Sequence, residues 1–149
     1  MSFFKISTIV FALCFISACS SSNSESVMQA QKPQCIKDTV CPEVAIKKKN
    51  DKYNIFVSIP DTSMSIQSVG FKADNSITKY EVDSAQVERS VTGENTFLIM
   101  NVDEGFLNSI IKANNSEILI TTNKGYINGV IKANNMESGL FKGINNFLG

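Results

Sequence analysis

The sequence predicts an α+β domain: a small, mainly antiparallel sheet of about five to seven strands with two helices in the C-terminal half. Two patterns indicate this class. From residue 53 to 102, short segments rich in aromatic and β-branched residues are separated by turn residues such as Pro60-Asp61 and Thr92-Gly93. After residue 103, apolar residues recur at helical spacing in two separate places.

The strands are expected over 53–59, 63–69, 77–82 and 86–91, followed by a strongly apolar segment, 96–102, as a candidate central strand. In the second of these, Met64 and Ile66 alternate with polar residues, which is the period-2 pattern of a strand with one buried face. The turn cluster 73–76, Ala-Asp-Asn-Ser, separates it from the next strand.

An internal repeat occupies the C-terminal third. Residues 105–117 recur as 125–137, and eight of the 13 positions are identical. A solenoid needs at least three stacked units, and no third copy is found, so a local duplication, or chance in an Asn-rich chain, explains the repeat better.

The two copies are expected to differ in structure. The first has Phe106, Leu107, Ile110 and Ile111 on one helical face, with Asp103 as an N-cap. The second follows a strand over 118–122 and a turn over 123–125, so it is expected to form the hairpin partner over 126–132. Gly129 favours the strand, because glycine in a helix costs about 1 kcal/mol.

A last helix is predicted from one apolar stripe: Leu140, Phe141, Ile144, Phe147 and Leu148. We expect it to pack on the sheet. The alternative is a membrane-surface or partner-binding helix, but such a helix usually carries several basic residues, and this one has only Lys142.

The first 19 residues have the order of a secretory signal: Lys5, an apolar run over 6–16, and small residues before Cys19. The run is too short to span a bilayer, which needs roughly 20 apolar residues. The segment resembles a bacterial lipoprotein signal with the lipobox Ile16-Ser17-Ala18-Cys19. The resemblance implies cleavage before Cys19, acylation of that residue (palmitate among the chains) and anchoring in the cell envelope. Ser20 would favour the outer membrane if the source is Gram-negative. The alternative is an ordinary signal peptide in which Cys19 is incidental.

Four segments are expected on this basis: a signal peptide over 1–18, a lipidated flexible tether over 19–34, a disulfide-containing segment over 35–52, and the α+β domain over 53–149. The tether is predicted from its Ser- and Gln-rich composition, which offers little to bury. Its average reach would be roughly 20 Å.

Of the four cysteines, Cys14 would leave with the signal and Cys19 would carry lipid, by the same resemblance. Cys35 and Cys41 remain, and outside the cytoplasm such a pair indicates a disulfide. A loop this short adds about 2 kcal/mol of stability. A redox or metal pair is the alternative; redox pairs usually have two intervening residues, and the chain has no histidine for a zinc site.

Composition argues against several functions. Lysine and arginine number 14 and aspartate and glutamate 14, so there is no basic footprint for nucleic acid. The one basic cluster, Lys47-Lys48-Lys49 with Lys52, is expected to be solvated; contact with anionic headgroups is the alternative. With no histidine, Ser-His and Cys-His nucleophile systems are excluded.

Paired carboxylates are the remaining catalytic option, and the nearest candidates are Asp103-Glu104 and Glu81-Asp83. Neighbouring strand residues point to opposite faces, which disfavours the first pair. We therefore expect a non-catalytic binding module of the envelope, with no cofactor or metal. Its partners would be membrane lipid, through acylated Cys19, and an envelope protein or cell-wall component. The alternatives are an accessory of an outer-membrane complex and a small carboxylate-dependent hydrolase.

Overall fold

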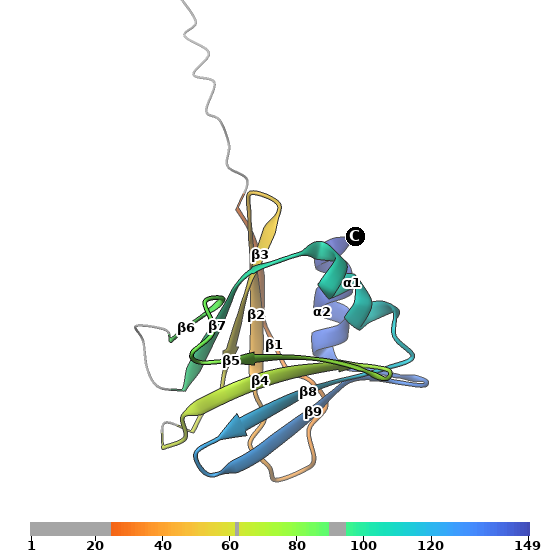
Figure 1. Cartoon of the computed structure of the whole chain (residues 1–149). Helices are drawn as coiled ribbons and strands as arrows, with labels where there is room; N and C mark the ends of the chain where they lie inside the picture. Colours follow the sequence, from red (N-terminus) through yellow and green to blue (C-terminus); the bar gives the residue numbers. More distant parts are fainter. Residues whose placement is uncertain (1–24, 62, 90–94) are drawn as a thin grey trace, which may run out of the picture.

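The structure is a computed structural model that describes residues 25–61, 63–89 and 95–149. The described residues form ten strands in two five-stranded antiparallel sheets, together with two helices in the C-terminal half. The α+β class and both helices are confirmed. The strands are divided between two sheets instead of forming the one smaller sheet expected (Figure 1).

The first sheet has the order β1-β2-β3-β7-β6, with β1 at Ser26–Gln31, β2 at Glu43–Lys49, β3 at Lys52–Ser58, β7 at Thr96–Val102 and β6 at Val87–Arg89. The second has the order β10-β9-β8-β4-β5, with β10 at Met136–Glu137, β9 at Gly125–Ala133, β8 at Asn115–Thr122, β4 at Ile66–Ala73 and β5 at Ser76–Glu81. Helix α1 spans Glu104–Lys112 and helix α2 spans Gly139–Leu148.

The domain begins earlier than predicted. Strand β1 lies inside the expected tether, 19–34, and β2 lies inside the expected disulfide segment, 35–52. The tether is predicted from its polar composition. That composition does not reveal β1, because the strand buries only Met28 and is held mainly by backbone pairing with β2. The folded unit therefore includes β1 and β2, and the predicted boundary at 53 is wrong.

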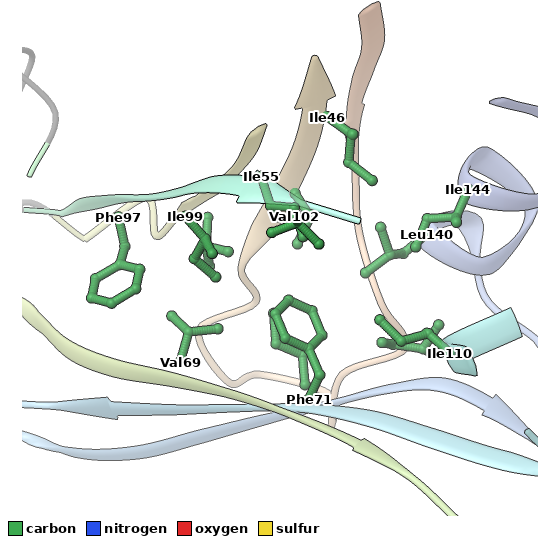
Figure 2. Packing of buried hydrophobic residues seen from close by; sticks show 14 of the residues in the cluster. Ile46, Ile55, Val69, Phe71, Phe97, Ile99, Val102, Ile110, Leu140 and Ile144 are labelled. Carbon is green, nitrogen blue, oxygen red and sulfur yellow. The ribbon is translucent and has the colours of Figure 1, made fainter. Parts of the chain in front are cut away.

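The core lies between the two sheets, and both helices contribute to it. Figure 2 shows Ile55 and Ile99 from the first sheet facing Val69 and Phe71 from the second. At the side of the sheets, Ile110 of α1 and Leu140 and Ile144 of α2 point into the same core (Figure 2). Burial of α2 along its apolar stripe confirms that it packs on the sheets.

The repeat is confirmed to adopt two structures. Its first copy forms α1 and the start of β8, whereas its second forms β9 and β10. Asp103 is the N-cap residue of α1 by position, but its side chain makes no capping hydrogen bond. Among the described residues, neither helix is long and apolar enough to cross a membrane.

Candidate functional site

The outer face of the second sheet is formed by side chains that point away from the core. Along β9, Ile127 and Ile131 face inward, so Tyr126 and Asn128 face outward. The strand register places Leu119 of β8 opposite Asn128 on one side and Gly70 of β4 on the other. The outer face of the second sheet therefore combines apolar, small and polar side chains.

Large apolar side chains are exposed on and beside this face. The exposed fraction is 84% for Tyr126, 75% for Ile36 and 59% for Ile77. Together with half-buried Leu119, we call these residues the outer apolar patch. The remaining large apolar side chain with high exposure among the described residues, Val27 at 52%, lies on β1 in the other sheet.

Two shallow grooves run through the patch and share Tyr126 and Asn128. The first, of about 400 Å³, is lined by Ser68, Gly70, Ile77, Lys79, Leu119, Thr121, Tyr126 and Asn128. The second, of about 340 Å³, is lined by Ile36, Thr39, Val40, Met64, Tyr126, Ile127 and Asn128. Apolar walls with a few convergent hydroxyl and amide groups are typical of binding surfaces.

The loop that presents Ile36 is closed by Cys35 and Cys41, whose sulfur atoms lie at disulfide-bond distance, 2.08 Å. Inside the loop, the Thr39 hydroxyl and amide both donate to the carbonyl of Ile36, at 2.6 and 3.2 Å. The cross-link and this turn hold Ile36 in place beside β9.

Of the four carboxylates singled out from the sequence, Asp103, Glu104 and Glu81 are each engaged with a neighbouring group. Asp103 pairs with Lys52, and Glu104 accepts a hydrogen bond from the Tyr53 hydroxyl at 2.9 Å. Glu81 pairs with Lys79 at 2.7 Å, and hydrogen bonding to this lysine lowers the pKa of the Glu81 carboxyl. A general acid in glycoside hydrolysis needs the opposite, a raised pKa. Glu81 is therefore held as an ionised partner of a surface lysine.

The basic cluster lies in the hairpin formed by β2 and β3. Lys47 pairs with Glu25 at 2.9 Å, Lys48 lies 4.0 Å from Asp51, and Lys52 pairs with Asp103. These contacts balance much of the positive charge, as expected for a solvated segment. Cys19, the predicted lipid site, lies outside the described residues.

Sequence reasoning did not select the outer apolar patch. A signal was present, because the predicted hairpin already put Ile127, Gly129 and Ile131 on one face and therefore Tyr126 on the other. The contribution of Ile36 could not be foreseen, since nothing in the sequence places the disulfide loop beside β9.

Within the described ranges, no group of three or more His, Cys, Asp or Glu side chains is arranged to hold a metal ion. No protein-family model, curated protein or solved structure matches the chain.

Proposed function

We propose that this protein is a lipid-anchored lipoprotein of the cell envelope that binds a protein partner through the outer apolar patch, without catalysing a reaction. The observation that carries the proposal is the exposure of Tyr126 and Ile77 on one face of the second sheet, with exposed Ile36 beside Tyr126 in the adjoining groove. Scattered apolar residues are ordinary on protein surfaces, but a contiguous group marks an interaction site.

The chemistry of the patch suits a protein partner. Tyrosine is enriched in interfaces because it combines a large apolar ring with a hydroxyl that remains able to hydrogen-bond. Around Tyr126, the grooves offer Thr121 and Asn128 as polar groups at the rim of the apolar surface. This arrangement of an apolar centre and polar rim resembles the general anatomy of protein interfaces.

The anchor would leave the patch facing away from the membrane. If Cys19 carries lipid, only residues 20–25 separate it from the start of β1 in the sequence. Strand β1 starts beside the β2–β3 hairpin, since Ser26 pairs with Lys48. That hairpin lies at the top of Figure 1, whereas the β8–β9 turn, next to Tyr126, lies at the bottom.

The binding proposal is tested by in-cell crosslinking of the full chain. A photoreactive amino acid replaces Asn128, and the crosslinked fraction is compared between this chain and the same chain carrying Tyr126→Ser or Ile77→Ser. We expect both substitutions to reduce the crosslinked adduct at least about tenfold, as for an interface anchor. Val27→Ser, on the other sheet and with an exposed fraction close to that of Ile77, is the control and should leave the adduct unchanged. Equal adduct in all four chains would refute binding through the patch.

The anchor is tested separately by Cys19→Ser. We expect this variant to leave the membrane fraction, because the acyl chains supply the attachment. Membrane retention of the variant, with the outer apolar patch intact, would overturn the lipoprotein assignment.

A further inference from the structure

Strand β5 forms an open edge of the second sheet. Among the described residues it pairs with β4 alone, over six residue pairs in unbroken register. Five of its six residues are exposed, and Tyr80 is half-buried. An edge of this kind presents unpaired backbone groups to any strand of matching geometry.

The β4–β5 hairpin determines which backbone groups of β5 are free. Ala73 and Ser76 close the two-residue turn, so the amide and carbonyl of Ser76 point toward β4. The same orientation recurs every second residue, and Val82 accordingly donates its amide to Gln67 of the chain entering β4. The backbone amide and carbonyl groups of Ile77, Lys79 and Glu81 therefore point away from β4, toward the open edge of the sheet.

We infer that β5 pairs with β5 of a second copy of this chain, antiparallel, about a two-fold axis at Tyr80. The backbone groups that point away from β4 restrict the register, because Lys79 and Glu81 can pair only with residues of the second copy whose backbone groups also point away from their own β4. Centring the axis on Lys79 would oppose two lysines, and centring it on Thr78 would place Lys79 against Ile77. Centring it on Tyr80 places Lys79 of each copy opposite Glu81 of the other copy, so that two pairs of opposite charge form. Opposite charges in cross-strand positions stabilise a pair, and like charges destabilise it.

The other face of β5 fits the same register. Tyr80 would lie opposite its own copy in a pair without backbone hydrogen bonds, where side chains approach most closely. Its ring is already positioned by an edge-to-face contact with Phe106, with ring centroids 6.0 Å apart. Glu81 retains an acceptor for the new strand, since its carbonyl receives one hydrogen bond, from Ser84, and has two lone pairs. The two second sheets would then be continuous across the axis.

Charge reversal tests the pairing. The full chain is purified in mild detergent, and its dimer dissociation constant is measured by sedimentation equilibrium. Lys79→Glu and Glu81→Lys should each weaken dimerisation at least about tenfold, because each creates two like-charge contacts across the axis. The double variant Lys79→Glu/Glu81→Lys should regain the dimer. Lys142→Glu, an exposed charge reversal on α2, is the control and should have no effect. A monomer at all concentrations, or no recovery in the double variant, would overturn the inference.

Single cysteines report the register directly. Residues facing each other in such a pair have Cα atoms about 4.5 Å apart, within the range that a disulfide bridges. Tyr80→Cys should therefore form a symmetric disulfide dimer on mild oxidation, read on a non-reducing gel. Thr78→Cys and Lys79→Cys should crosslink much less. Preferred crosslinking from either of these would assign a different register and refute the one inferred here.

Discussion

At the residue scale, Gly129 of β9 makes room for the segment that links β1 to the disulfide loop, which packs directly on it. Gln34 exchanges two backbone hydrogen bonds with Val130, at 2.7 and 2.9 Å, which brings buried Pro33 over Gly129. A Cβ atom at position 129 would lie 2.4 Å from Cγ of Pro33. Glycine is therefore required here by close approach of another segment, although its φ is ordinary.

We predict that Gly129→Ala lowers the free energy of unfolding by about 1–3 kcal/mol, the usual effect of overpacking a rigid contact. The matched control is Gly70→Ala in β4, where the nearest atoms to the new Cβ would lie at 3.7 Å. That control should be neutral or slightly stabilising, since alanine is less flexible than glycine in the unfolded chain. Urea denaturation measures both. Equal effects of the two substitutions would contradict the role given to Pro33.

Tyr53 gives a second residue-scale prediction, on pH. The residue is buried, its hydroxyl donates to Glu104, and its ring meets Phe147 edge to face at 6.0 Å. Burial, and then the hydrogen bond to Glu104, raise the pKa of Tyr53. The native phenol therefore keeps its proton to higher pH than the unfolded phenol. Its contribution to stability is complete below about pH 10, the ordinary tyrosine pKa, and is lost as pH rises through the native pKa.

We expect the wild-type chain to lose stability as the pH rises above about 10, the ordinary tyrosine pKa, and Tyr53→Phe to lose less over the same interval. Part of the decline should remain, because burial also raises the pKa of Tyr80. At pH 7 the substitution should itself destabilise by about 1–2 kcal/mol, since a hydrogen bond to a charged carboxylate is removed. Urea titrations at each pH provide the measurement, and an unchanged alkaline decline in Tyr53→Phe would show that this phenol is not responsible.

At the scale of elements, the repeat shows what local sequence can decide. Both copies contain Ile-Lys-Ala-Asn-Asn, yet one forms the end of α1 and the other the end of β9. Gly129 in place of Ser109 disfavours the helix, and the preceding strand with its turn supplies a hairpin partner for the second copy. These are local signals, and for that reason the two structures could be predicted from the sequence.

Elements stabilised by distant contacts could not be predicted in the same way. In β1, one buried methionine and backbone pairing to β2 hold a segment whose composition is typical of a linker. In β2, the alternation of Val44 and Ile46 is too short to distinguish a strand from a loop. The division into two sheets likewise depends on which strands meet, and the outer apolar patch depends on where the disulfide loop packs.

The N-termini of the two helices provide an element-scale prediction. The Ser138 hydroxyl accepts a hydrogen bond from the amide of Phe141 at 3.1 Å and is buried, whereas Asp103 makes no such bond to α1. Ser138→Ala should therefore lower the free energy of unfolding by about 1–2 kcal/mol, the usual loss of a capping bond. Asp103→Ala is the comparison and should lose less, since it removes an exposed ion pair with Lys52. Thermal unfolding of both variants measures the difference, and a larger effect at Asp103 would reverse the assignment of the caps.

At the scale of the whole molecule, α2 joins the two sheets. It contacts β1 at the edge of the first sheet, β9 in the second, and α1. Leu140 and Ile144 are fully buried, and Figure 2 shows them beside Ile110 in the shared core. Because one helix packs against both sheets, we infer that the sheets unfold together as a single cooperative unit.

Leu140→Ala tests this coupling. Removing a fully buried leucine side chain should lower the free energy of unfolding by about 2–5 kcal/mol. Amide hydrogen exchange then measures the protection of backbone amides in each sheet separately. If they form one unit, the slowest amides of β3 in the first sheet and of β8 in the second should lose protection by the same factor. Phe147→Ala, at a half-buried position on the same helix, should reproduce this equal loss on a smaller scale. Loss of protection in only one sheet would show that each sheet is stable on its own and that α2 covers the core without coupling its two halves.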